Sequence, residues 1–577
     1  MVHSFRPTLL LSMSGFSFHT RSSRRIKRIR GSILIDKDGV EQSHRDFGCF
    51  KSSFLRFPRR LLLPTPAMAV ILEVLDNQHL LQGVVLALVL VFVSSFYHEI
   101  ADSFPYKNIP LVGKGKWEIT NTKAKHRFVT SAKELFAEGF SQGRKAFQVH
   151  FSARPTIVLH PSLTNEVKNN PLLDFNEANK KIPGFEPFDG LDHEGIFLEV
   201  INKKITQGLG QLTTPLSRET IAVLNEKLPD SGEWLPFTFA QEIPHIVARL
   251  SSLVFLGEKI CRDKQWLDVS VNYTIHAFVA ARDLRLYPTV LRPFVHWFLS
   301  STRRTRQDIR VASAIINREV EKRILIREGK LPEEDPPRTH ADTLDWFEEV
   351  AAGRPLDLAV AQVGLSLAAI HTTSNLLTNI MYDLTAYPEH IQPLRDEIKA
   401  IISEDGGLKK TSLTKMKMMD SVLKESQRMH PAGVAFINRV AMGDITLSDG
   451  TRIPKGASIA VSAHNMEDES LYPNAKTYDG FRFYKKRQEP GNEHRFQFVT
   501  TSPEHLGFGH GMHACPGRFF ASNEVKILLI HFLMRYDWKF ADGRTTRPMN
   551  FMHGTESICD PTVEFLFKPR QPEVDLS

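Results

Sequence analysis

Ten residues near the C-terminus, Phe508-Gly509-His510-Gly511-Met512-His513-Ala514-Cys515-Pro516-Gly517, decide the fold of this chain. The cysteine follows a glycine-rich turn and directly precedes an apolar-periodic segment that predicts a helix. Backbone N–H groups and the dipole at a helix N-terminus favour a negatively charged thiolate. The glycines allow the backbone to turn tightly and to approach a flat or bulky group. We therefore expect Cys515 to be a ligand of such a group.

Cysteine usage leaves other interpretations of this segment open. A buried, inert cysteine is the common case, and zinc ligation by His510, His513 and Cys515 with His505 as a fourth ligand is another. The spacing lacks the paired CxxC or HxxxH pattern of most zinc sites. The spacing of the four cysteines, Cys49, Cys261, Cys515 and Cys559, gives neither a CxxC pair nor a disulfide framework. This favours a reducing compartment, or a fold that does not depend on disulfides.

Composition and charge indicate a globular protein with a basic N-terminal tail. The 577 residues are 42% hydrophobic and 24% charged, which is enough apolar material for a large core. Residues 1–67 contain 13 basic and 4 acidic residues, a balance of +9. Because the whole chain has a net charge of +8, the rest of the chain carries −1. A nucleic-acid-binding body is thereby disfavoured. The tail is a disordered basic segment, an extension upstream of a true start at Met68, or a mitochondrial transit segment.

An uncharged run of 18 residues, Leu80–Tyr97, follows the tail. At about 1.5 Å per residue it nearly crosses a hydrocarbon core of roughly 30 Å, so it predicts a single transmembrane anchor. A signal peptide and a buried core helix are the alternatives. Residues 98–116 form a predicted proline- and glycine-marked linker, and 117–570 form the predicted catalytic domain. For a chain starting at Met68, the charges flanking the anchor place that domain in the cytosol.

The remaining pattern predicts a mainly α fold with a small β portion. Ala146–Phe151 and Thr156–Leu159 are strand-like, and Lys181–Phe197 is a loop-rich segment typical of a substrate entrance or a surface connection. Asp357–Thr385 predicts a long central helix, because its polar residues 371–375 are unsuited to a membrane span.

Three further motifs precede the cysteine segment. The long helix contains Ala368-Ala369-Ile370-His371-Thr372-Thr373, whose hydroxyls can bond their own helix or turn toward a ligand. Glu425 and Arg428, spaced i, i+3, share a helix face and can pair. Arg482, between aromatic residues, can supply a third member of that charge network.

The order of these four motifs resembles that of cytochrome P450 haem-thiolate monooxygenases over Phe104–Pro569. Details such as Leu367-Ala368-Ala369-Ile370-His371-Thr372-Thr373 and Gly480-Phe481-Arg482-Phe483-Tyr484 are similar to the fungal branch that includes ent-kaurene oxidase. The resemblance implies the mainly α P450 fold with its small β portion, and a haem b whose iron takes the Cys515 thiolate as axial ligand.

The resemblance also implies roles for individual residues. Phe508 would pack near the Cys515 sulfur, and Gly511 would belong to the cofactor-binding loop. Thr372 would aid proton delivery. His371 stands where the family usually has an acid, and it either relays protons or points away and leaves that role to water and Thr372. His513 stands where the family usually has arginine, so haem propionate binding would rest more on Arg439 and on a cation near Lys203-Lys204. The buried charge network would consist of Glu425, Arg428 and Arg482, and the substrate pocket would be lined by Ala369, Val434, Ala435, Phe436 and Thr555.

The implied reaction is insertion of one oxygen atom from O2 into a lipophilic small molecule, a terpenoid by family analogy. Electrons would come from NADPH through a cytochrome P450 reductase at the endoplasmic reticulum membrane, without nucleic-acid partners. An isomerase or dehydratase that needs no reductase, and a non-catalytic metal-binding membrane protein, are the alternatives. The candidates for docking the reductase are basic residues after the Arg482 motif and near the cysteine, namely Lys485, Lys486, Arg487, Arg518 and Lys526.

Overall fold

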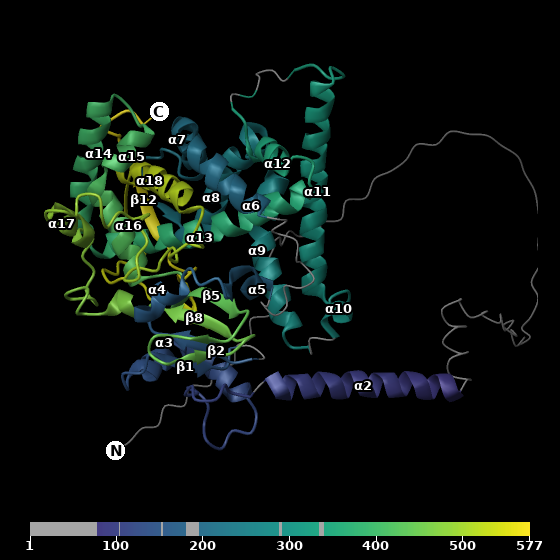
Figure 1. Ribbon diagram of the computed structural model, residues 1–577. Coiled ribbons are helices and arrows are strands. Elements are labelled where there is room, and N and C mark those ends of the chain that lie inside the picture. The colour runs from purple at the N-terminus through teal and green to yellow at the C-terminus, as the bar shows by residue number, and fades with distance from the viewer. Residues whose placement is uncertain are drawn as a thin grey trace, which may run out of the picture. The chain divides into compact units, whose positions relative to one another are not determined.

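The computed structural model describes residues 78–102, 104–151, 154–180, 195–287, 291–333, 338 and 340–576 (Figure 1). The chain divides into two units, Met1–Asn77 and Gln78–Ser577. The predicted basic tail, 1–67, lies outside the described residues, as do residues 181–194 of the predicted entrance loop.

The second unit is mainly helical, as predicted. Its long helices in chain order are α2 (Gln78–Asp102), α3 (Thr122–Phe140), α7 (Thr206–Lys227), α8 (Phe239–Ile260), α9 (Lys264–Leu284), α11 (Ser300–Arg327), α13 (Leu358–Ala386), α14 (Ile391–Asp405), α16 (Lys417–Met429) and α18 (Arg518–Arg535). The shorter ones are α4 (Thr164–Val167), α5 (Phe175–Lys180), α6 (Ile196–Glu199), α10 (Arg292–Val295), α12 (Thr343–Ala351), α15 (Lys410–Lys415), α17 (Arg482–Gln488), the 3₁₀ turns η1 (Pro161–Leu163), η5 (Pro388–His390) and η6 (His464–Glu467), and the π-helical η3 (Val200–Ile205).

Helix α13 is the predicted central helix and lies within one residue of its predicted bounds. The Asp357 carboxylate caps its first turn by accepting hydrogen bonds from the N–H groups of Ala359 and Val360, both at 3.0 Å. The helix contacts α8, α9, α11 and α16, and Figure 1 shows it passing through the middle of the helical body. Most of its side chains are therefore buried, which explains why its sequence is apolar on nearly every face.

A five-stranded sheet, in the order β1-β2-β8-β5-β3, is the largest β element. The pairs β1–β2, β8–β5 and β5–β3 are antiparallel and β2–β8 is parallel. Strand β2 has its predicted bounds, whereas β1 ends two residues before the predicted Phe151. The strands are β1 (Ala146–Val149), β2 (Thr156–Leu159), β3 (Leu173–Asp174), β5 (Ala435–Ala441) and β8 (Ser458–Ser462).

Smaller sheets complete the β portion. In one of them, β12 lies between β4 and β9 and pairs antiparallel with both. The other two are the antiparallel pairs β6–β7 and β10–β11. The strands are β4 (Leu235–Phe237), β6 (Ile445–Thr446), β7 (Arg452–Ile453), β9 (Tyr536–Phe540), β10 (Phe551–His553), β11 (Glu556–Ile558) and β12 (Phe565–Pro569).

Helix α2 contains the predicted anchor segment, Leu80–Tyr97, and extends it to Asp102. Within the described ranges, no helix has both the length and the hydropathy that crossing a membrane requires. A helix at this position is confirmed, but its prediction as a transmembrane span is not.

The segment after α2, predicted as a linker, is bound to the first strand of the sheet. The buried Gln148 side-chain amide accepts from the Tyr106 N–H at 2.9 Å and donates to the carbonyls of Tyr106 and Ile109 at 2.9 and 2.7 Å. The Gln148 backbone N–H donates to the Pro110 carbonyl at 2.8 Å. Tyr106–Pro110 is therefore part of the folded body.

Candidate active site

The cysteine segment forms a tight loop that ends at α18. Gly509 and Gly511 have φ values of 67° and 86°, in the left-handed region that favours glycine. The loop is closed by two backbone bonds, from the Cys515 N–H to the Phe508 carbonyl at 2.8 Å and from the Ala514 N–H to the Gly511 carbonyl at 3.0 Å. The prediction of a cysteine at a helix N-terminus is confirmed, because α18 begins at Arg518 with Gly517 as N-cap.

The protein groups around the Cys515 sulfur by themselves favour the thiol over the thiolate. Burial raises the pKa of the Cys515 thiol, while hydrogen bonding to the backbone N–H groups of Gly517 and Arg518 and the Arg518 charge oppose that rise. A metal ion deprotonates a thiol that coordinates it. The two N–H groups would then stabilise the thiolate against desolvation.

Phe508 supports the loop from the protein interior. Its ring packs against the main core and contacts the fully buried Phe498 ring edge-on, with a centroid separation of 5.0 Å. Because the Phe508 carbonyl also accepts the Cys515 N–H, the position of this residue fixes that of the cysteine backbone.

Gly511 is the point at which the loop approaches another part of the chain. A Cβ atom there would lie 2.6 Å from Asn169 Oδ1 and 2.8 Å from Lys168 Cβ, closer than van der Waals contact. The Met512 N–H donates to the same Asn169 oxygen at 2.8 Å. No sequence pattern predicted this contact, because Asn169 lies in a different part of the chain.

Gly511→Ala is expected to disturb the cysteine loop more than Gly509→Ala. Both positions have positive φ, so both substitutions strain the backbone, but a Cβ at Gly509 would meet nothing closer than 3.9 Å. We expect Gly511→Ala to bind markedly less haem per protein than Gly509→Ala, measured as the ratio of haem absorbance to protein absorbance after purification. Equal haem content in the two variants would contradict the expectation.

Arg439 and His513 lie together around one aromatic ring. The His513 imidazole stacks on Phe175 with a centroid separation of 5.0 Å, and the Arg439 guanidinium lies over the same ring at 5.2 Å. Burial and the Arg439 charge lower the pKa of His513, and burial lowers the pKa of Arg439 to about 10. At neutral pH this favours a charged Arg439 and a neutral His513. Phe175, at the start of α5, was not predicted, although it directly follows the short strand β3.

The lysines suggested as additional propionate ligands are engaged elsewhere. Lys203 pairs with Glu199 at 2.7 Å, and Lys204 pairs with Glu349 of α12 at 2.6 Å. Both ion pairs are partly exposed, so the role of a cation near Lys203-Lys204 in haem anchoring stays a prediction. On the cysteine side one cation at the loop is Lys168, whose Nζ lies 3.1 Å from His510 Nε2.

Thr372 and His371, neighbours on α13, differ in exposure and in hydrogen-bond partner. The exposed Thr372 hydroxyl donates to the Ala368 carbonyl at 2.7 Å, and Ala368, one turn earlier, is exposed as well. His371 is half-buried, and its Nε2–H donates to the Val271 carbonyl of α9 at 2.9 Å. Burial lowers the pKa of His371, which favours the neutral imidazole. Ala369 is half-buried on the same stretch of the helix.

Four of the five predicted pocket residues lie at the start of β5 and in the β10–β11 turn, while Ala369 lies on α13. The Val434 N–H donates to the Thr555 carbonyl at 2.8 Å, and a Cβ on the preceding Gly433 would lie 2.9 Å from that oxygen. Val434, Ala435, Phe436 and Thr555 are all half-buried. Beyond Phe436 the β5–β8 register shifts, and Arg439 on the same strand is buried.

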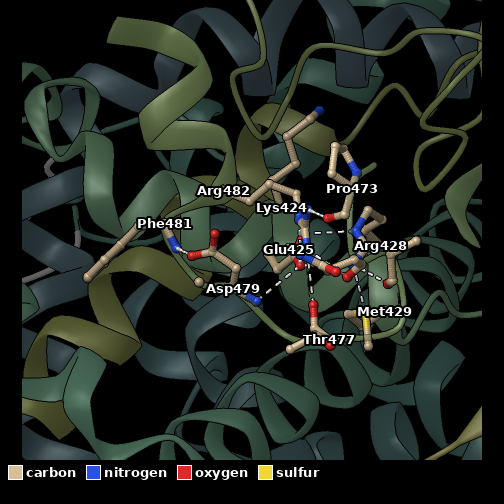
Figure 2. Close-up of polar contacts among 12 residues, drawn as sticks. Lys424, Glu425, Arg428, Met429, Pro473, Thr477, Asp479, Phe481 and Arg482 are labelled. Atoms are coloured by element: carbon tan, nitrogen blue, oxygen red, sulfur yellow. Dashed lines mark hydrogen bonds and ion pairs between the residues drawn. The ribbon is translucent and has the colours of Figure 1, made fainter. Parts of the chain in front are cut away.

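Glu425, Arg428 and Arg482 form the predicted buried charge network (Figure 2). Arg428 binds Glu425 through two hydrogen bonds of 2.8 Å, and Arg482 Nε donates to Glu425 Oε1 at 3.0 Å. The remaining guanidinium N–H groups donate to backbone carbonyls: Arg428 to those of Met466 and Ala475, and Arg482 to those of Pro473, Asn474 and Thr477. The network thus fixes the segment from Met466 to Thr477 on α16.

Two of the predicted docking residues are buried and cannot present their charge to a partner. Arg487 and Lys526 both contact Asp420, at 3.3 and 2.6 Å, and both side chains are 6% exposed. Their prediction as reductase-docking residues is wrong, because a charge run in sequence does not reveal an internal carboxylate partner. Lys485 is exposed, and Lys486 and Arg518 are half-buried.

The three histidines of the zinc alternative have separate partners. His513 stacks on Phe175, and His510 lies 3.0 Å from the Thr501 hydroxyl. The buried His505 donates to the Lys424 carbonyl at 3.2 Å. Across the described residues, no group of three or more histidine, cysteine or acidic side chains is arranged to hold a metal ion.

Two features of the site fit a haem group. Arg439 is 3% exposed, and among the described residues its guanidinium donates one hydrogen bond, to the Asn438 carbonyl, and forms no salt bridge. The Asp174 carboxylate acts on this guanidinium through its charge, but no salt bridge between the two is formed, so the guanidinium N–H groups are available to an anionic propionate. Ala368 and Thr372 form an exposed strip midway along the otherwise largely buried α13, where a flat group can lie against small side chains.

Comparisons with known proteins match this chain to one family. The family model described as Cytochrome P450 matches residues 200–567. The chain is 41% identical to cytochrome P450 monooxygenase hepE of Aspergillus oryzae, over 80% of this chain and 86% of that protein. It is 40% identical to ntnM of Nectria sp (82% and 90% covered) and 36% identical to calE of Penicillium decumbens (88% and 98% covered), both also cytochrome P450 monooxygenases.

Proposed function

The chain belongs to the cytochrome P450 family, and from that premise we propose that it oxidises a lipophilic secondary metabolite of the terpenoid class. As a cytochrome P450 monooxygenase it uses haem bound through a cysteine thiolate and electrons that originate from NADPH. When bound, haem supplies the oxidising chemistry: one atom of O2 enters the substrate, and two electrons and two protons reduce the other atom to water. The observation that carries haem-dependent oxidation is Cys515 at the N-terminus of α18, in a loop that Phe508 and Gly511 position.

Arg439 and His513 are proposed to hold the haem propionates. Arg439 would contribute the charge, and the neutral imidazole of His513 would contribute a hydrogen bond. Phe175 lies against both side chains and would hold them in place. Haem binding in this chain would therefore depend mainly on Arg439.

The substrate is proposed to lie between α13 and the segment formed by β5 and the β10–β11 turn. The side chains offered there are small or apolar: Ala369, Val434, Ala435 and Phe436, with the hydroxyl of Thr555. None of them carries a charge, which favours a hydrocarbon-rich substrate such as a terpenoid. Thr555 would contact a polar substituent, because its hydroxyl is the polar side-chain group among the five.

Thr372 is proposed to deliver protons, and His371 to hold α13 against α9. The Thr372 hydroxyl is exposed and can exchange its bond to the Ala368 carbonyl for one to a water molecule. His371 uses its Nε2–H for the Val271 carbonyl, which supports a positioning role over a proton relay.

Thr372→Ala is expected to lower product formation about 100-fold while NADPH consumption continues, because a positioned proton donor typically contributes 10²–10⁴-fold. Thr373→Ala is the matched control, since Thr373 is adjacent but 2% exposed. Product and NADPH are measured in the same reaction. A Thr372→Ala enzyme with the wild-type ratio of product to NADPH would contradict the assignment.

The proposed redox partner is a membrane-bound NADPH–cytochrome P450 reductase. Lys485, Lys486 and Arg518 remain candidates for docking it, because their positive charges would attract an acidic partner surface. We also propose that α2 attaches the protein to the endoplasmic reticulum membrane, with the body in the cytosol. The support is the exposure of large apolar side chains along α2, among them Leu86, Leu88, Leu90, Phe92 and Val93.

Expression in yeast with a reductase, followed by feeding a panel of terpenoids, tests the function. We expect an oxygenated product whose formation requires NADPH. Turnover without NADPH would instead support the isomerase or dehydratase alternative. Separation of the same cells into membrane and soluble fractions tests the attachment, because a chain lacking 78–102 is expected to shift toward the soluble fraction.

A further inference from the structure

A second buried charge cluster lies between α16 and the segment that precedes the cysteine loop. It consists of Asp420 and Lys424 of α16, Arg487 of α17 and Lys526 of α18, each at most 6% exposed. The Glu425 network does not include any of them. Buried charges are costly unless they are paired and hydrogen-bonded, so the groups that they contact show what the cluster holds in place.

Two members of this cluster, Asp420 and Lys424, hold one turn, Gln497–Thr500, by its backbone. The turn is closed by a hydrogen bond from the Thr500 N–H to the Gln497 carbonyl at 3.0 Å. The Lys424 ammonium donates to both the Gln497 and the Thr500 carbonyls, at 3.0 and 2.9 Å. Asp420, one helical turn before Lys424, accepts from the Phe498 N–H at 2.8 Å. One face of α16 therefore binds the 497–500 turn at three backbone groups.

Two routes lead from the 497–500 turn to Cys515. In the first, the Phe498 ring contacts Phe508, whose carbonyl accepts the Cys515 N–H. In the second, the Val499 carbonyl accepts from Arg518 Nε at 3.2 Å, and Arg518 Nη1 donates to the Cys515 carbonyl at 2.8 Å. The turn thus supports the cysteine at both its N–H and its carbonyl group.

We propose that Lys424 is a positioning residue for the haem thiolate, acting through the 497–500 turn on both backbone groups of Cys515. Groups that orient a metal ligand tune the metal site, and mutating them typically costs about 10- to 100-fold in metal affinity or activity. The Lys424 ammonium is well placed for this, because it is almost fully buried and its two carbonyl acceptors belong to one turn. Burial lowers the pKa of Lys424 to about 7 against the opposing charge of Asp420, as expected for an ammonium without water around it.

Lys424→Met tests the proposal, because it keeps the length of the side chain and removes both hydrogen bonds to the turn. In the full-length haem protein, reduced and bound to CO, we expect conversion from the thiolate-ligated to the thiol-ligated spectral form to accelerate about 10-fold. Hydrogen exchange at the Cys515 amide is expected to accelerate as well, which gives a readout that does not require turnover.

Lys526→Met is the matched control. Lys526 is equally buried and binds Asp420 at 2.6 Å, but its other contact is the Leu413 carbonyl at 2.9 Å and not the 497–500 turn. We expect it to lower thermal stability but to keep the wild-type conversion rate and Cys515 exchange. Equal acceleration in both variants, or a wild-type rate in Lys424→Met, would overturn the proposal.

If Lys424→Met does not fold, Phe498→Leu tests the first route alone. It reduces the contact with Phe508 and leaves the Lys424 bonds in place. We expect faster conversion than in wild type, and an unchanged rate would overturn this route. The proposal rests on Cys515 as the haem ligand, which Cys515→Ser tests separately, because loss of ligation removes the thiolate form altogether whereas loss of positioning only shortens its lifetime.

Discussion

Cys515→Ser is expected to abolish the thiolate-type reduced-CO spectrum and to lower monooxygenase activity to background. The serine hydroxyl occupies nearly the same volume, so the backbone bond from residue 515 to the Phe508 carbonyl can persist. A hydroxyl is far less acidic than a thiol, and it cannot supply the electron density with which a thiolate favours O–O cleavage. Spectra and product are measured on variants purified in parallel with wild type.

Cys559→Ser is the control for this prediction. Cys559 is buried, and burial raises the pKa of its thiol to about 12, so it is inert at neutral pH. Its sulfur lies 3.5 Å from the Asn375 carbonyl, a weak contact that serine can replace. We expect this variant to keep the thiolate spectrum. A thiolate spectrum in Cys515→Ser would show that Cys515 is not the ligand.

Glu425→Gln is expected to be strongly destabilising, by about 3–5 kcal/mol, because it leaves two guanidinium groups without their carboxylate. The side chains of Glu425 and Arg428 are 0% exposed and that of Arg482 is 9% exposed, so solvent cannot compensate for the lost charge. Urea unfolding followed by circular dichroism measures the change. A loss below about 1 kcal/mol, within the range of ordinary substitutions, would contradict this role.

Glu199→Gln is the matched control for the buried network. Glu199 also forms a helical ion pair, with Lys203 at 2.7 Å, but the two side chains are 38% and 66% exposed. Exposed pairs of this kind contribute little, because water and salt screen them. We expect its unfolding midpoint to stay close to that of wild type. The contrast would separate the effect of burial from that of charge removal.

The sequence predicted those parts of the site that depend on local spacing. The Glu425–Arg428 pair follows from the i, i+3 geometry of a helix, and the position of Cys515 follows from a glycine-rich turn before a helix. The bounds of β2 and α13 follow from apolar runs between turn signals and caps.

Contacts between distant segments could not be predicted in this way. Asn169 against Gly511, Phe175 between Arg439 and His513, and Lys424 on the 497–500 turn all join residues that no local pattern connects. The same reason explains the wrong docking prediction for Lys526, whose charge is satisfied by Asp420, 106 residues earlier in the chain. Whether a charged side chain is exposed is a property of the packed fold, which a run of basic residues does not encode.

The hydrogen bonds between Gln148 and Tyr106–Pro110 limit the length of the connection between α2 and the sheet. Helix α2 ends at Asp102, and the first tethered backbone group is the Tyr106 N–H, four residues later. Four residues reach at most about 14 Å even when fully extended. The Tyr106 backbone therefore stays within that distance of the end of α2, so a partner that binds the C-terminal end of α2 lies close to the β1 edge of the sheet.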